Sequence, residues 1–157
     1  MAIKVLFVCI HNSARSQMAE AFLLKFGGEE FEAHSAGIEP GKLNPYVVKV
    51  LNEDEGIDIS NNKTKSAIDF VKQGKLFQYI ITVCDESSYQ RCPIFPGVRE
   101  RIMMNFDDPS TFEGTEEEIL DKVRIVKEKI KKEVLRFIEL IKNKELKLNF
   151  PSDWKLG

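Results

Sequence analysis

Hydrophobic residues follow two patterns along this chain, short apolar runs and longer amphipathic stretches. The short runs, rich in β-branched and aromatic residues, are typical of strands and cover residues 3–8, 31–36, 77–83 and 101–106. Apolar residues at three- and four-residue spacing, typical of helices, cover residues 16–26, 45–56, 66–73 and 115–141. Strands that alternate with helices build a parallel sheet covered on both faces. The pattern therefore predicts an α/β fold with four parallel strands.

Residues that favour helix ends flank these stretches. Thr115 and Glu118 form a capping-box pattern at the start of the longest helix. Pro45 suits the first turn of a helix, and Gly27 follows the first helix, where glycine commonly ends one. These residues support the predicted helix bounds.

The chain has no repeat, low-complexity run or linker that would divide it. We expect a single domain over residues 1–143 and a C-terminal tail over residues 144–157, whose role the sequence does not define. The tail contains Phe150 and Trp154, and we expect these aromatic residues to dock onto the body of the protein.

The composition is that of a globular protein. The chain has 157 residues, of which 43% are hydrophobic and 31% charged, and its net charge of −2 gives no reason to expect nucleic acid or an acidic membrane as a partner. No signal peptide or membrane-spanning run is recognisable, so we expect a cytoplasmic protein. We also expect a monomer. In a reducing compartment, three cysteines suit catalysis or redox cycling. No cluster has the spacing of a zinc site, so we expect no metal and no tightly bound cofactor.

Candidate chemistry begins at Cys9, which follows the first apolar run. Five residues separate it from Arg15, and the next helix begins with Ser16. A helix N-terminus offers unpaired amide groups and a positive dipole end, which stabilise a thiolate and bind anions. Arg15 adds a planar fork that fits two oxygens of a tetrahedral oxyanion. A buried structural cysteine is the alternative, but the combined spacing of Cys9, Arg15 and Ser16 favours an oxyanion site with a nucleophilic sulfur.

This stretch resembles the low-molecular-weight protein tyrosine phosphatase superfamily. Gln17 after Arg15-Ser16 is similar to its thioredoxin-coupled arsenate reductase branch, because the phosphatases usually have proline there. The resemblance implies the strand order 2-1-3-4, with the Cys9 loop at the carboxyl edge of the sheet. Ser35-Ala36-Gly37 also matches a tripeptide of the superfamily, although a plain turn explains it nearly as well. The resemblance assigns oxyanion binding to Ile10, His11, Asn12, Ser13, Ala14, Arg15 and Ser16.

Two further cysteines, Cys84 and Cys92, follow the third predicted strand, so Cys84 should emerge at the same sheet edge as Cys9. The polar segment between them is typical of a mobile surface loop. Two structural cysteines are the alternative. In the reductases that this chain resembles, a second and a third cysteine pass oxidation outward from the nucleophile. Their spacing here is one residue longer than in common members of that branch.

Asp108 stands directly before Pro109, after the fourth predicted strand. The superfamily carries its general acid in this position, and a carboxyl group near the anion can protonate a leaving oxygen. An ordinary Asp-Pro turn is the alternative. The phosphatases usually continue with tyrosines that grip an aryl substrate, whereas this chain continues with Ser110 and Thr111. That difference argues against phosphotyrosine as the natural substrate, though not against residual phosphatase activity.

Some reductases of the branch hold potassium at positions that correspond to Asn12, Glu20 and Ser35. Lys63 and Lys65 stand here in the region of the remaining acidic ligand. A lysine ammonium could take the place of the cation, so potassium remains an alternative that we do not expect.

The resemblance implies reduction of arsenate to arsenite, with Cys9 as nucleophile, Arg15 on the oxyanion and Asp108 as acid. Cys84 and Cys92 would complete a disulfide relay that thioredoxin recycles. A phosphatase that uses Cys9, Arg15 and Asp108 alone is the first alternative, and a non-catalytic redox or oxyanion sensor is the second. His11 lies inside the loop and could line the pocket or tune the nucleophile.

Overall fold

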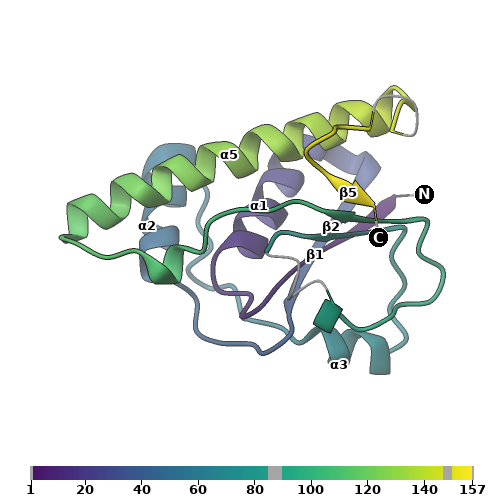
Figure 1. Cartoon of the computed structure of the whole chain (residues 1–157), viewed down its shortest axis with the longest axis horizontal. Helices are drawn as coiled ribbons and strands as arrows, with labels where there is room; N and C mark the ends of the chain where they lie inside the picture. Colours follow the sequence, from purple (N-terminus) through teal and green to yellow (C-terminus); the bar gives the residue numbers. More distant parts are fainter. Residues whose placement is uncertain (1, 85–89, 147–149, 157) are drawn as a thin grey trace.

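A β-sheet forms the centre of the computed structural model, which describes residues 2–84, 90–146 and 150–156 (Figure 1). Its strand order is β2-β1-β3-β4-β5. β1 pairs in parallel with β2 and β3, and β3 with β4, which confirms the predicted order of the first four strands. The strands are β1 (Ile3–Cys9), β2 (Phe31–Gly37), β3 (Tyr79–Thr82), β4 (Glu100–Met103) and β5 (Lys155–Leu156).

The fifth strand corrects the expectation of four strands, all parallel. β5 comes from the C-terminal tail and pairs antiparallel with β4 at the edge of the sheet. Both of its residues are exposed, and a strand of two residues is too short to show an alternation of apolar and polar positions.

Tail aromatic residues hold this strand in place. Trp154 is only 4% exposed and belongs to the main core. Its indole Nε1 donates a hydrogen bond of 2.6 Å to Glu133, and its ring lies 5.8 Å from that of Phe150. A tertiary contact next to the strand, not a pattern within it, therefore determines the pairing.

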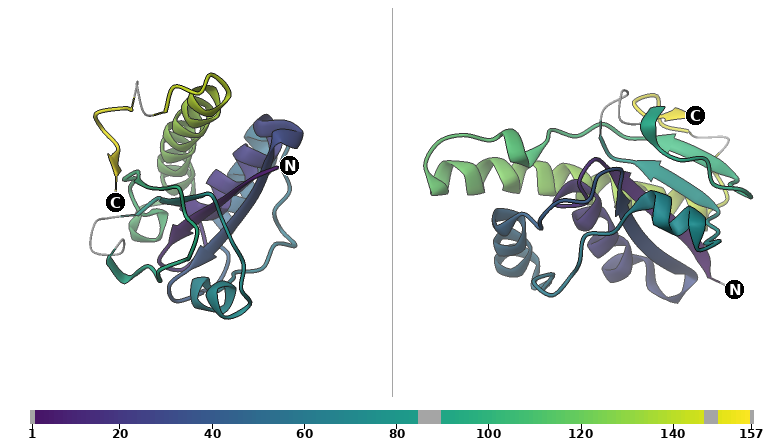
Figure 2. Two further views of the ribbon diagram at one scale, coloured as in Figure 1. Left: turned by 90° about the vertical axis from the view of Figure 1, so that its right-hand side faces the viewer. Right: turned by 90° about the horizontal axis from the view of Figure 1, so that it is seen from below.

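Helices cover both faces of the sheet, as predicted (Figures 1 and 2). Residues of α1, α2 and α5 pack on one face, and residues of α3 pack on the other. In the described ranges, no helix combines the length and the apolar character needed to cross a membrane. The helices are α1 (Arg15–Gly27), α2 (Pro45–Glu55), α3 (Ala67–Lys72) and α5 (Glu116–Lys142), with 3₁₀ turns η1 (Gly28–Glu30) and η2 (Pro109–Thr111).

The side chains of β1 alternate between these two layers, because successive residues of a strand point to opposite faces. Phe7 and Cys9 lie in the cluster with α1, α2 and α5, which we call the first core. Leu6 and Val8 lie in the cluster with α3, which we call the second core. Cys9 therefore ends β1 on the side of the first core.

A buried lysine fastens the long helix α5 to the end of α2. The Lys127 Nζ lies 3.0 Å from Glu55 and 3.2 Å from Asp54. Burial lowers the pKa of this ammonium, but its hydrogen bonds to Glu128, Glu55 and Asp54 outweigh burial and raise the pKa to about 12. Lys127 therefore stays charged and paired in the folded protein.

Removing the Trp154 ring tests the contribution of the tail. Trp154→Ala should lower the free energy of unfolding by about 3 kcal/mol, because it empties a buried aromatic site. Leu156→Ala is the matched control: that side chain is 55% exposed, so its change should stay within about 0.5 kcal/mol. Chemical denaturation followed by circular dichroism measures both, and equal small changes would show that the tail adds no stability.

Candidate active site

The loop between β1 and α1 lies at the carboxyl edge of the sheet, next to its middle strands. Cys9 is the last residue of β1, and α1 begins six residues later at Arg15. Ala14 occupies the N-cap and makes no side-chain cap bond, so no cap side chain covers the amides of the first turn. The positive end of the α1 dipole therefore faces this loop.

The carbonyl groups of the loop face the segment that follows β2. Backbone amides of residues 38–44 donate to the carbonyl oxygens of Cys9, Ile10, His11 and Ser13, at 2.8–3.1 Å. In a trans peptide the N–H points opposite to the C=O. The amides that follow these carbonyls are therefore turned toward the other side, where they can bind an anion.

Two donors act on the Cys9 sulfur, which is buried. The backbone amide of Asn12 donates to Cys9 Sγ at 3.2 Å, and Ser16 Oγ lies 2.8 Å from it. Because Ser16 Oγ accepts a 2.8 Å hydrogen bond from Asn12 Nδ2, its own proton is available for the sulfur. Both contacts hold the Cys9 sulfur at the loop, beside the N-terminus of α1.

Asn12 holds the loop in a conformation that few residues adopt. Its φ of 55° lies in the left-handed region, which asparagine tolerates better than most residues. Its side-chain Oδ1 accepts hydrogen bonds from Gln17 Nε2 at 3.1 Å and from the backbone amide of Lys65 at 2.9 Å. The buried Asn12 amide thus links the loop, α1 and the segment before α3.

Sequence reasoning missed the supporting role of Gln17, which it used only as a mark of the branch. Gln17 is buried and reaches three groups: Asn12, the carbonyl of Lys63 and the side chain of Asn62, each at 3.1 Å. A polar residue in the first turn of a helix is ordinarily solvent-exposed. Since Asn62 and Lys63 lie far along the chain, no local signal identified this contact.

Arg15 and Asp108 meet at the same edge from different elements. Arg15 Nη2 lies 3.4 Å from Asp108 Oδ2, and Arg15 Nη1 donates to the carbonyl of Phe106 at 3.1 Å. Asp108 caps the η2 turn, and its Oδ1 accepts from the Ser110 amide at 2.9 Å. This cap holds the Asp108 carboxyl group against the guanidinium of Arg15, the first residue of α1.

The acidic residue Glu20 is already paired. Ser35 Oγ donates to Glu20 Oε1 at 2.7 Å, and Lys65 Nζ lies 3.7 Å from the same oxygen. An ammonium thus stands where a cation would neutralise this carboxylate, so the residues present do not fit a potassium ion. Across the described part of the chain, no group of three or more His, Cys, Asp and Glu side chains could hold a metal ion.

His11 is exposed, and its Nδ1 forms a 2.8 Å hydrogen bond with the carbonyl of Glu39. The ring therefore lies against the segment after β2. His34, in β2, pairs with Glu32 on the strand's own surface and takes no part in the loop.

The three cysteines are reduced thiols that lie in two different layers. Cys84 follows β3 in the first core, and its Sγ lies 3.9 Å from the carbonyl of Val8, the residue before Cys9. Cys92 lies in the second core, on the other face of the sheet. Of the segment between Cys84 and Cys92 that was predicted to be a mobile loop, residues 85–89 lie outside the described residues, while Gln90 and Arg91 are helical and exposed. The structure thus brings Cys84 to the strand end of Cys9 but does not bring Cys92 there.

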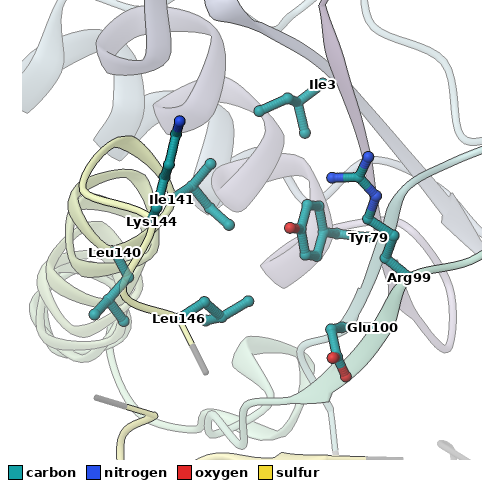
Figure 3. Close-up of a pocket in the computed structure, with 8 residues that line it drawn as sticks. All are labelled: Ile3, Tyr79, Arg99, Glu100, Leu140, Ile141, Lys144 and Leu146. Atoms are coloured by element: carbon teal, nitrogen blue, oxygen red, sulfur yellow. The ribbon is translucent and has the colours of Figure 1, made fainter. Parts of the chain in front are cut away.

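A cavity of about 660 Å³ lies at the opposite end of the sheet, where the strands begin (Figure 3). Its walls come from the first residues of β1, β3 and β4 and from the end of α5. Apolar side chains such as Leu140 and Ile141 face charged ones such as Arg99 across it (Figure 3). None of the lining residues belongs to the Cys9 loop, so this cavity is separate from the candidate site.

Comparison with known proteins agrees with this geometry. The family model for low molecular weight phosphotyrosine protein phosphatases matches residues 4–147. An arsenate reductase of Halalkalibacterium halodurans is 40% identical over 135 residues, which cover 86% of this chain and 94% of that protein.

Solved structures show the same fold. A thioredoxin-dependent arsenate reductase of Corynebacterium glutamicum superposes with a TM-score of 0.59 at 30% identity. That match covers 88% of this chain, and this chain spans 63% of the length of that protein. A low molecular weight protein tyrosine phosphatase of T. tengcongensis gives a TM-score of 0.71 at 24% identity, covering 88% of this chain and 99% of that one.

Gly37 provides a direct test of the loop architecture. A Cβ at this position would lie 2.8 Å from backbone atoms of Ile10, His11 and Asn12, so the loop would have to move. Gly37→Ala should therefore cost about 2 kcal/mol of stability and weaken binding of inorganic phosphate. Denaturation and calorimetric titration measure the two effects.

The control is Gly41→Ala, whose Cβ would meet only the His11 side chain, at 3.3 Å. Its effect on both measurements should be small. Normal phosphate binding by Gly37→Ala would show that the loop does not bind the anion in this conformation.

Proposed function

The chain belongs to the low molecular weight phosphotyrosine protein phosphatase family, and we propose that it uses the site at Cys9 to reduce arsenate to arsenite. The observation that carries this proposal is the position of Cys84, buried beside the end of β1 on the face where Cys9 lies. Phosphoester hydrolysis requires one cysteine, whereas reduction by thiols requires a second within reach. The relative of 40% identity, named an arsenate reductase, supports the same assignment.

In the first step, arsenate binds to the loop amides and to Arg15. The Cys9 thiolate attacks arsenic(V), and a hydroxyl group departs as water with a proton from Asp108. The hydrogen bond from the Asn12 amide and the contact with Ser16 Oγ hold the sulfur in place for the attack. Loop amides and the guanidinium stabilise the oxygens of the arsenic adduct.

The second step transfers two electrons to arsenic. The Cys84 thiolate attacks Cys9 Sγ, the sulfur–arsenic bond breaks, and its electron pair leaves with arsenic as arsenite. A Cys9–Cys84 disulfide remains, so two sulfurs are oxidised while one arsenic is reduced. The first core, which contains both sulfurs, keeps bulk water from most of this exchange.

The third step moves the disulfide to Cys92. The Cys92 thiolate attacks Cys84 Sγ, which forms Cys84–Cys92 and releases Cys9 as a thiolate. Because Cys92 is packed in the second core, this step requires it to leave that packing and approach Cys84. An external dithiol reductant of the thioredoxin type then reduces the new disulfide and completes the cycle.

Phosphatase activity is the second candidate, because it needs only Cys9, Arg15 and Asp108 and the family model bears its name. After Pro109 the chain has Ser110 and Thr111, whose amide and hydroxyl bond to Asp108. No aromatic ring at these two positions can stack on an aryl phosphate. We therefore propose phosphoester hydrolysis as a side activity of the same loop.

Cysteine variants separate the two functions. With thioredoxin, its reductase and NADPH, the unmodified protein should convert arsenate to arsenite through many turnovers. Cys92→Ser should release one equivalent of arsenite and stop as a Cys9–Cys84 disulfide. Cys84→Ser should release none, because no thiol can displace arsenic from Cys9. Arsenite analysis and mass spectrometry of the disulfides measure these outcomes.

Hydrolysis of an aryl phosphate should survive in both variants, which shows that the loop is intact. Rapid hydrolysis of the aryl phosphate by all three proteins, with no arsenite formed, would indicate that the chain is a phosphatase. Tight binding of arsenate without either reaction would instead indicate a sensor.

Asp108→Asn tests the proposed general acid. Asparagine can still accept the Ser110 amide, so the η2 cap should survive while the proton donor is lost. We expect kcat/KM for arsenate to fall by about 100-fold or more. Asp107→Asn is the matched control, since Asp107 is an exposed neighbour, and it should stay near the original rate. Equal rates for both variants would exclude Asp108 as the acid.

A further inference from the structure

Cys92 has surroundings that disfavour a nucleophilic thiolate. Burial raises the pKa of its thiol, because an anion is poorly solvated among apolar groups. Its neighbours in the second core come from β1, β2, β3, α3 and the segments around them: Leu6, Val8, Ala36, Ala67, Phe70, Phe77, Ile80 and Phe95. The relay nevertheless requires Cys92 to attack as a thiolate.

A positively charged side chain of β4, that of Arg101, extends from the sheet toward the second core. Arg101 is paired in register with Ile80 of β3, whose side chain lies in the second core. The next residue, Ile102, lies in the first core, so alternation directs the Arg101 side chain to the face of Cys92. Its Nε and Nη2 atoms are buried.

Arg101 acts on the Cys92 sulfur in two ways. Its positive charge and its side-chain hydrogen bond both lower the pKa of Cys92, against the larger effect of burial. Among the described residues, Arg101 is the charged side chain found to act on this thiol. Arg91, one residue before Cys92, is exposed and pairs with Glu39.

We propose that Arg101 is a positioning residue for the third step: it orients Cys92 and stabilises its thiolate in the second core, before Cys92 leaves that packing to attack Cys84. This inference rests on the proposed relay. Cys92 first loses its proton to solvent. Its electron pair then forms the bond to Cys84 Sγ, and the Cys9–Cys84 bond breaks with its electron pair on Cys9.

Different groups contact the attacking sulfur of Cys92 and the leaving sulfur of Cys9. Arg101 stabilises the attacking sulfur, while the Asn12 amide and Ser16 Oγ contact the sulfur that leaves. Thiol–disulfide exchange proceeds faster when the leaving thiolate is the more stable one. The loop that makes Cys9 a nucleophile in the first step therefore makes it a good leaving group in the third.

The first test isolates Cys92. In a Cys9→Ser, Cys84→Ser protein, Cys92 is the one remaining cysteine, and the ultraviolet absorbance of its thiolate can be titrated with pH. Arg101→Gln should shift the midpoint upward by about one pH unit, because a neighbouring positive charge is lost. Arg101→Lys should restore part of the shift, and Arg91→Gln should leave the midpoint in place. An unshifted or lowered midpoint in Arg101→Gln, with a normal melting temperature, would overturn the proposal.

The second test follows a single turnover of arsenate in the protein with all three cysteines. Arg101→Gln should release the first arsenite at the normal rate, then form the Cys84–Cys92 disulfide about tenfold more slowly at neutral pH, with recovery at higher pH. A slow first release, or a slow third step that higher pH does not restore, would contradict a role at Cys92.

The two tests also distinguish this inference from the proposed function. The titration needs no arsenate, so a shifted midpoint in a protein that never reduces arsenate would overturn the relay, and with it a role for Arg101 in catalysis. Normal reduction together with an unshifted midpoint would overturn only the assignment of Arg101.

Discussion

The loop of the candidate site depends on a single buried asparagine, Asn12, whose backbone amide and side-chain amide are all hydrogen-bonded. The Asn12 amide donates to Cys9, its Nδ2 to Ser16, and its Oδ1 accepts from Gln17 and the Lys65 amide. Each of these groups would be costly to bury without a partner, so the four contacts stabilise the left-handed backbone at Asn12. The same network orients the nucleophile and joins the loop to distant segments.

Local chemistry explains why the centre of the site could be predicted from sequence. Cys9, Arg15 and Ser16 lie on one strand–loop–helix unit, so their spacing alone determines which groups face a bound anion. Asp108 lies far along the chain and was identified by the resemblance; it reaches this edge because it follows β4, which runs parallel to β3. The first four strands were predictable from their apolar runs, whereas their order came from the resemblance to the superfamily.

Contacts between distant segments explain the rest. β5 has no pattern of its own and depends on the burial of Trp154. Gln17 looks like a surface residue until Asn62 and Lys63 fold against it. The layer in which Cys92 packs depends on how the chain after β3 returns to the sheet, which the sequence does not determine locally.

The places of the three cysteines on the sheet and along the chain bear on the order of thiol exchange in the proposed relay. Cys9 and Cys92 pack against opposite faces, and a disulfide forms only when the Cα atoms come within about 7 Å. For a direct Cys9–Cys92 bond, one of the two residues would have to move around the end of β1 to the opposite face of the sheet. Cys84 lies beside the end of β1 and is also joined to Cys92 by a short stretch of chain, so it is the residue suited to exchange with both. Cys84 also packs in the first core, so its exchange with Cys92 has to cross the sheet as well. Its nearness to Cys92 along the chain, rather than its layer, therefore favours Cys84 over Cys9 as the partner of Cys92 in the proposed relay.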